Sequence, residues 1–254
     1  MQAIADHLAE RTHPETAAGW DPVGLHLGDP SASAHTVAVC HEITEAVVTR
    51  LETNPVDVLV TYHPLLFTPV NRVLAGRSPE ARAYRLIRLG ISVVVLHTDF
   101  DAAPGGTADA LAAAFNLRDI EPFGEDVEAG LPAIGRFGTF DGSLAALDAR
   151  ATDLFGSSGL RISGPPDQHL SRVAVVPGSG ASLVDSAATV AGAIVTGDVP
   201  HHQVVRALDL GLSVVDPGHI ATERPGMVNL MALVAAIPDV DVVDLTEIDP
   251  ETWG

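Results

Sequence analysis

The sequence predicts an α/β fold made of two intertwined, duplicated α/β repeats, with mostly parallel sheets flanked by helices. Three observations predict it. Short apolar runs alternate with segments of helical periodicity, the two halves contain similar segments in the same order, and hydrophobic residues make up 46% of the 254 residues. Alternating strands and helices favour a parallel sheet covered by helices. The hydrophobic content is ample for its core.

Eight strands are expected, because eight short runs rich in Val, Leu or Ile lie between turn-forming residues. They span residues 36–40, 57–61, 91–96, 134–140, 172–176, 192–196, 212–216 and 240–244. Segments with apolar residues at helical spacing lie between these strands and predict helices. The expected helices span residues 2–11, 43–53, 79–89, 106–115, 143–154, 182–190, 201–210 and 226–236.

The two halves of the chain share three pairs of similar segments in the same order. The pairs are TVAVCHEITEAVVTRL with RVAVVPGSGASLVDSA, VDVLVTYHP with AGAIVTGDVPHH, and AYRLIRLGISVVVLHTDFD with QVVRALDLGLSVVDPGHIATE. This order indicates a duplicated unit. We therefore expect a first α/β repeat over residues 1–125 and a second over 126–254, intertwined as one compact unit. The acidic, Gly- and Pro-containing stretch 120–135 is expected to cross the surface between them.

The chain is strongly acidic, with 33 acidic residues, 14 basic residues that are all Arg, and a net charge of −19. This charge argues against direct binding of nucleic acid, which needs clustered cations. Four arginines fall on or just before the predicted helix 79–89, where a solvated, ion-paired face is the expected role: Arg77, Arg82, Arg85 and Arg88. Either a GC-rich genome or a salty cytoplasm explains the composition, and we favour the halophile-like explanation.

The sequence also bears on the compartment and on disulfides. No apolar run approaches the roughly 20 residues that a membrane-spanning helix needs, and the first residues lack a signal-peptide pattern. We therefore expect a cytoplasmic protein with no membrane partner. Cys40 is the only cysteine and lies in an apolar run. It is expected to be a buried, inert thiol.

Polar residues with metal-binding chemistry follow the expected strands. His63 follows strand 57–61, His97 and Asp101 follow strand 91–96, and His219 and Glu223 follow its repeat partner. Because ligands bind outside the carboxyl ends of parallel strands, we expect these side chains to converge at one rim. Pro64 would end the strand just past His63. Some of the histidines could instead cap loops or satisfy buried carbonyl groups.

Imidazoles mixed with carboxylates are typical ligands of Zn, Mn, Fe, Co or Ni. A carboxylate can bridge two such ions about 3.5–4 Å apart, as in many metal-dependent hydrolases. Two neighbouring motifs have simpler explanations. In GWDPVGLHLGD, Trp20 is expected to pack and Asp21 to turn the chain, with lining of the cavity as the alternative role of the segment. In TGDVPHHQ, Asp198 is either a general base or a turn residue.

The chain resembles the Nif-three-like family, the GTP cyclohydrolase I type 2 homologues. The resemblance covers nearly the whole chain, through GWDPVGLHLGDP, VTYHPLLF, LHTDFDAAPGGTADAL, TGDVPHHQVVRAL and VVDPGHIATERPG. It implies two intertwined α/β repeats and a dinuclear centre with two divalent metal ions per subunit. The ligands that it implies are His63, Asp101, His219 and Glu223.

One departure from the family pattern affects the second metal position. Many members have a His-His pair before the proline, whereas this chain has Tyr62 in place of the first histidine. A neutral phenol is a poor ligand, since its pKa is about 10. His97 and one of His201 or His202 are the candidates that could compensate, and the same three are the candidate catalytic proton carriers.

The resemblance implies a hydrolase, because two metal ions bring the pKa of water from near 16 toward about 7. The expected substrate is a small molecule, either a nucleotide or another phosphorylated or cyclic compound. The alternative is a non-enzymatic metal-binding adaptor, regulatory or metal-handling protein. The resemblance also implies a homo-oligomer, a hexameric ring.

Overall fold

The computed structural model describes residues 1–125 and 132–248, which fold into two compact units. The first unit contains Met1–Phe100 and the segment from Leu230 onward, and the second contains Asp101–Asn229. The chain leaves the first unit within helix α4 (Thr98–Ala102) and returns within helix α9 (His219–Ala235). The division of the sequence repeats at residues 125 and 126 stays a prediction.

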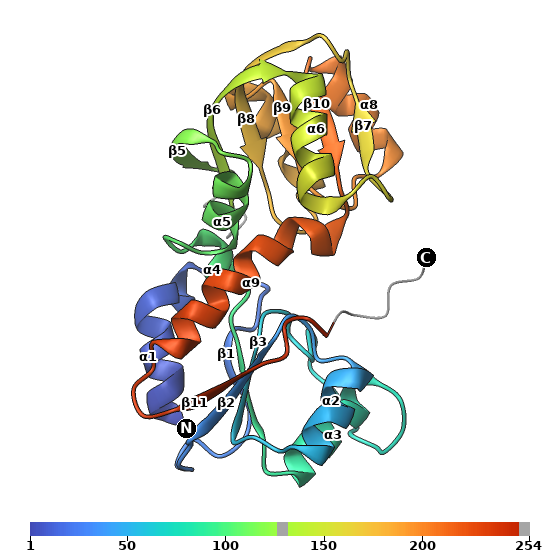
Figure 1. The fold of residues 1–254 in the computed structure, drawn as a ribbon. Coiled ribbons are helices and arrows are strands. Elements are labelled where there is room, and N and C mark those ends of the chain that lie inside the picture. Colours follow the sequence, from blue (N-terminus) through green and yellow to red (C-terminus); the bar gives the residue numbers. More distant parts are fainter. Residues whose placement is uncertain (126–131, 249–254) are drawn as a thin grey trace. The chain divides into compact units, whose positions relative to one another are not determined.

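The first unit is built on a five-stranded sheet in the order β1-β4-β3-β2-β11 (Figure 1). Strands β2 (Thr36–Cys40), β3 (Val58–Thr61), β4 (Ser92–Val95) and β11 (Asp241–Asp244) run parallel, and β1 (Gly24–Leu27) pairs antiparallel with β4. Residues of β2, β3 and β4 are almost fully buried. This burial explains why these strands are continuous apolar runs.

Helices α2 (Glu45–Thr53) and α3 (Pro79–Arg88) pack against this sheet and share its core, while α1 (Gln2–Thr12) contacts β1. Side-chain caps begin both helices of the pair: Thr44 accepts from the N–H of Val47, and Ser78 from that of Ala81. Arg85 of α3 pairs with Glu45 and Glu52 of α2. This ion pairing agrees with the role expected for the arginines of that helix.

The second unit is built on a six-stranded sheet in the order β5-β6-β8-β9-β10-β7. Its strands are β5 (Arg118–Phe123), β6 (Gly135–Ser143), β7 (Arg161–Ser163), β8 (His169–Val175), β9 (Ala193–Val195) and β10 (Ser213–Asp216). The centre β8-β9-β10 is parallel, whereas β5, β6 and β7 pair antiparallel. Hydrophobic clusters bury both faces. The helices are α5 (Thr107–Ala114), α6 (Leu144–Phe155), α7 (Val184–Val190) and α8 (His201–Asp209).

The duplication is visible in the fold of each unit. Both contain three adjacent parallel strands, β2-β3-β4 or β8-β9-β10, and both add an antiparallel strand, β1 or β7, beside the last of them. A Cβ on Gly28, just after β1, would lie 2.0 Å from the Oγ of Ser92, and one on Gly164, just after β7, 2.0 Å from the Oγ of Ser213. The same close approach therefore recurs at equivalent places.

The predicted strands and helices are all found, with changed ends, and further elements appear. Strands β1, β5 and β7 were not predicted, because they are short or exposed and lack a run of apolar residues. Helix α9 begins at His219 instead of residue 226, and it contains Pro225. Because a proline usually marks the start or the end of a helix, we predicted that this helix begins just after Pro225. In the described ranges, no helix could cross a membrane.

Candidate metal centre

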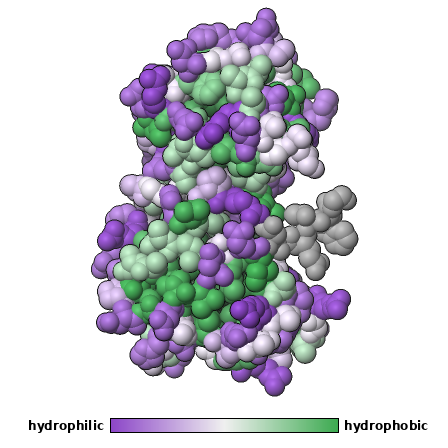
Figure 2. All heavy atoms as spheres, in the orientation of Figure 1, coloured by the Kyte–Doolittle hydropathy of each residue, from purple (hydrophilic) through white to green (hydrophobic). Residues whose placement is uncertain are grey.

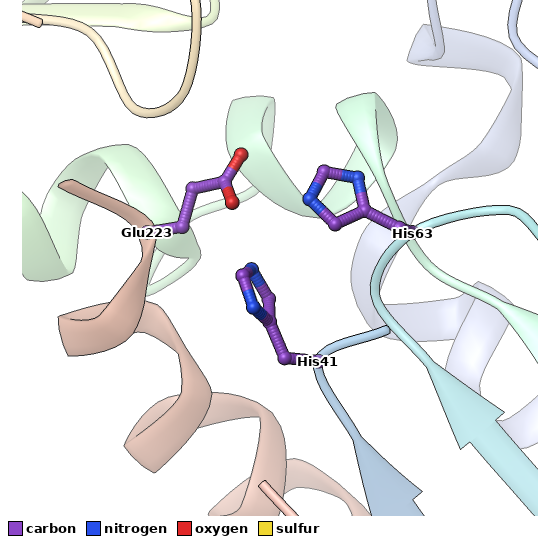
Figure 3. A group of neighbouring side chains, drawn as sticks. All are labelled: His41, His63 and Glu223. Carbon is purple, nitrogen blue, oxygen red and sulfur yellow. The ribbon is translucent and has the colours of Figure 1, made fainter. Parts of the chain in front are cut away.

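Three histidines follow three neighbouring parallel strands of the first unit. His41 follows β2, His63 follows β3, and His97 follows β4. The ring centroids of His41 and His63 are 4.9 Å apart, and those of His63 and His97 are 5.3 Å apart. The rings of His41 and His63 extend into a common region (Figure 3). Parallel strands that end together thus collect imidazoles at one edge of the sheet.

Tyr62 lies among these histidines and is only 1% exposed. Its ring stacks on His41, with centroids 5.6 Å apart and planes at 21°. Its ring is in an edge arrangement with the rings of His63 and His97, and the distances between centroids are 5.0 and 5.3 Å. Tyr62 therefore packs against all three imidazoles.

Asp21 holds the ring of His97. Its Oδ2 accepts from the ring Nδ1 of His97 at 2.9 Å, and from the backbone N–H and the hydroxyl of Thr98 at 3.0 and 2.5 Å. Burial acts to raise the pKa of Asp21, but the contacts with His97 and Thr98 outweigh burial and lower that pKa. The prediction that Asp21 only turns the chain is incomplete, because its carboxylate orients a candidate catalytic histidine.

Two exposed aromatic rings lie beside His97. Trp20 is 58% exposed and Phe67 is 48% exposed. Their centroids lie 6.2 and 5.8 Å from that of the His97 ring, both in edge arrangements. Trp20 packs against His97 at its edge while most of its side chain stays exposed, which favours the cavity-lining alternative for this segment. Its exposed ring borders the histidine cluster.

In the second unit, His219 lies between two carboxylates. Its Nε2 is 2.9 Å from Oε1 of Glu223, one helical turn along α9, and its Nδ1 is 2.8 Å from Oδ2 of Asp198. Burial would lower the pKa of His219, but the hydrogen bonds and charges of Glu223 and Asp198 raise it to about 9. The structure therefore brings together two of the ligands that the sequence predicted, and adds Asp198 as their neighbour.

Gly178 leaves room for this pair. It follows β8 and has φ of +62°, and a Cβ there would lie 2.6 Å from Oε1 of Glu223 and 3.2 Å from Nε2 of His219. Its backbone N–H donates to the hydroxyl of Thr222 at 2.9 Å. A residue with a side chain would therefore displace the carboxylate or the imidazole.

The other predicted site residues lie elsewhere on these elements. Asp101 is on α4 and is 4% exposed. His201 and His202 are exposed in the first turn of α8. Their roles as a ligand and as proton carriers stay predictions.

His41 was missed from the sequence. It directly follows strand 36–40, as His63 and His97 follow theirs, and applying the strand-end rule to every strand would have found it. In the first unit, His41 and His63 carry ring nitrogens that could bind a metal ion, and in the second unit Glu223 carries a carboxylate that could do the same (Figure 3). Imidazole nitrogen with carboxylate oxygen suits a divalent transition metal or zinc.

The chain matches the Duf34/NIF3 (NGG1p interacting factor 3) family over residues 1–250. It belongs to that family. A GTP cyclohydrolase 1 type 2 homolog from Lactococcus lactis is 32% identical over 209 residues, covering 81% of this chain and 80% of that protein. The Protein NIF3 homolog of Schizosaccharomyces pombe is 32% identical over 232 residues, covering 86% and 83%.

Solved structures support the fold of this Duf34/NIF3 chain. Reduced HcgD from Methanocaldococcus jannaschii superposes with a TM-score of 0.82 at 26% identity, over 96% of each chain. A Bacillus cereus protein related to NIF3 superposes with a TM-score of 0.86 at 19% identity, over 99% of this chain and 98% of that one. The family match over residues 1–250 confirms the predicted family, and the solved structures confirm the duplicated α/β fold.

Proposed function

We propose that this Duf34/NIF3 protein is a metal-dependent hydrolase of a nucleotide or another small phosphorylated or cyclic compound. The observation that carries the proposal is the chemistry of the donors: His41 and His63 with their rings 4.9 Å apart, and Glu223 beside His219. Buried Tyr62 packs against both His41 and His63, and Glu223 is itself buried. Such a set of nitrogen and oxygen donors fits a divalent ion.

In this proposal, two divalent ions are held by His63, Asp101, His219 and Glu223, with His41 supplying the imidazole that Tyr62 lacks. His41 is suited to that part because it stacks on Tyr62 and its ring lies next to that of His63. A divalent ion supplies a Lewis acid that brings the pKa of water from near 16 toward about 7.

The residues of this chain would supply orientation and proton transfer. His97 is the favoured proton carrier, because Asp21 fixes its ring beside His63. His201 and His202 are the alternatives, and their exposure suits proton exchange with solvent.

Trp20 and Phe67 support a substrate with a planar ring. Exposed aromatic faces stack on bases with a gain of about 1–3 kcal/mol per base, and both rings border His97. A nucleobase or a similar heterocycle would therefore bind beside the proposed proton carrier.

The test starts with elemental analysis of protein purified without an affinity tag, followed by a hydrolysis screen on nucleotides with and without chelator. We expect a divalent metal and a chelator-sensitive activity. His63→Ala should lower metal content and reduce kcat/KM at least about 100-fold, whereas His35→Ala, which changes an exposed histidine of the same unit, should not.

Each outcome decides between functions. A protein that binds metal but turns over no compound in the screen supports the metal-binding adaptor or metal-handling alternative. A protein that binds no divalent metal contradicts both proposals.

We also propose the homo-oligomer, a hexameric ring, that the resemblance implies. On the face shown in Figure 2, hydrophobic residues gather over the strands of the first unit's sheet, with hydrophilic residues around them. Burial of such a surface would favour self-association. Light scattering at several protein concentrations would give the mass, and a monomer throughout would contradict the proposal.

A further inference from the structure

Each unit contains one histidine whose Nδ1 is held by an aspartate far away in the sequence. In the first unit, Nδ1 of His97 lies 2.9 Å from Oδ2 of Asp21. In the second, Nδ1 of His219 lies 2.8 Å from Oδ2 of Asp198. The two histidines occupy equivalent places in the sequence repeats, since each is followed four residues later by an acid.

The chemistry of a carboxylate decides which nitrogen carries the proton. An ionised carboxylate only accepts hydrogen bonds, so the imidazole nitrogen that faces it must donate. Asp21 is ionised, because its Oδ2 also accepts from the N–H and the hydroxyl of Thr98. In the second unit, the carboxylate of Asp198 faces Nδ1 of His219 in the same way. In each unit the carboxylate therefore favours a proton on the Nδ1 that faces it.

We propose that Asp21 and Asp198 are positioning residues that fix His97 and His219 with Nδ1 protonated, so that Nε2 is the nitrogen that acts in each unit. In His219, Nε2 faces Oε1 of Glu223 at 2.9 Å, so without a metal ion this nitrogen donates to the carboxylate, and a bound ion would take the place of that proton. In His97, the contact of Nδ1 with Asp21 leaves Nε2 on the side of the ring that faces away from Asp21. This inference deepens the proposed function. It rests on that function only for the identity of the group that Nε2 binds.

The two aspartates do not come from equivalent parts of the repeats. Asp21 precedes β1, whereas Asp198 follows β9. Duplication alone therefore does not explain why both histidines have the same partner at the same nitrogen. A shared requirement for the orientation of the ring does explain it, because a carboxylate on one imidazole nitrogen sets the tautomer of a metal ligand or a proton carrier.

The backbone of Asp198 supports a role beyond stability. Its φ is +55°, a left-handed conformation that is unfavourable for most side chains. The pair that it forms with His219 is partly exposed, and such ion pairs contribute little to stability.

The first test is the tautomer of His97 in the metal-free protein. Long-range ¹H–¹⁵N spectra of histidine-labelled protein, assigned with His97→Gln, should show a proton on Nδ1. Asp21→Asn keeps a neutral acceptor and should weaken this state, and Asp21→Ala should weaken it further. Asp57→Asn is the matched control. Asp57 accepts three hydrogen bonds, from the backbone N–H of His35 and from the N–H and hydroxyl of Thr36, and none of them involves the ring of His97 or His219.

The second test measures metal binding at His219. Asp198→Gly tolerates the left-handed backbone but removes the carboxylate, and it should lower the affinity for Zn²⁺ about 10- to 100-fold. Asp198→Asn keeps an oxygen acceptor and should restore part of that loss. Asp185→Asn changes a carboxylate of the same unit that pairs with Arg206, and it should leave the affinity unchanged.

The outcomes separate this inference from the proposed function. A wild-type His97 with a bare Nδ1, or a tautomer that Asp21→Ala does not change, overturns the role of Asp21. Unchanged Zn²⁺ affinity in Asp198→Gly overturns that of Asp198. The expected tautomer in a protein that hydrolyses nothing would leave this inference in place and contradict only the hydrolase.

Discussion

Cys40 shows how the position of a residue decides its chemistry. It ends β2 with no exposed surface, and burial raises the pKa of its thiol to about 12. The thiolate is the reactive form, so we expect no reaction with a thiol reagent at pH 8 in the native protein. The measurement is absorbance with an aromatic disulfide reagent. Unfolded protein should release one equivalent, and one equivalent from native protein would contradict the prediction.

Gly178 gives a second prediction at the scale of one residue. In Gly178→Ala, the new Cβ would lie 2.6 Å from Oε1 of Glu223, so the carboxylate must move. We expect Zn²⁺ affinity to fall at least about 10-fold, which isothermal titration would measure.

The control is Gly159→Ala, also in the second unit. Gly159 has φ of +78°, but a Cβ there would meet nothing within 4 Å. Both variants should lose about 1 kcal/mol of stability from the left-handed backbone. Only Gly178→Ala should lose metal affinity, and equal affinities would rule out the role of Gly178.

At the scale of elements, Asp57 joins the start of β2 to the start of β3. Hydrogen bonds from the N–H groups of His35 and Thr36 hold the pKa of Asp57 below its ordinary value of 3.8. A carboxylate with a lowered pKa stabilises the folded state at pH values above its unfolded pKa, and that stabilisation is lost as the pH falls through the folded pKa.

Asp57→Asn should therefore lower the urea midpoint at pH 7, and the difference from wild type should shrink as the pH falls below about 4. Unfolding followed by circular dichroism across this range would measure it. A difference that stays constant with pH would show that the charge of Asp57 contributes nothing to stability.

At the scale of the whole molecule, the net charge of −19 opposes compactness through repulsion. Raising the salt concentration from 0.1 to 1 M shortens the screening length from about 10 to about 3 Å. We expect the thermal midpoint at pH 7 to rise with KCl. The effect should shrink near the sequence pI of about 4.7, and a midpoint that does not respond to salt at pH 7 would contradict the halophile-like interpretation.

The elements with strong local signals could be predicted from the sequence, and those without them could not. Strand β2 was predicted with the bounds Thr36–Cys40, because a strand buried on both faces is a continuous apolar run. Strands β5 and β7 lie at the edges of their sheet, where exposed residues carry no such pattern. The start of α9 was misplaced because Pro225 lies inside the helix.

The sequence by itself determined the duplicated α/β plan and the chemistry of the candidate site, because apolar periodicity, internal similarity and residue type are local properties of the chain. Only the tertiary structure decided that His41 joins His63 and that Asp21 and Asp198 hold His97 and His219. These contacts depend on how strands and loops distant in the sequence pack within each unit. Spacing along a chain does not encode that packing.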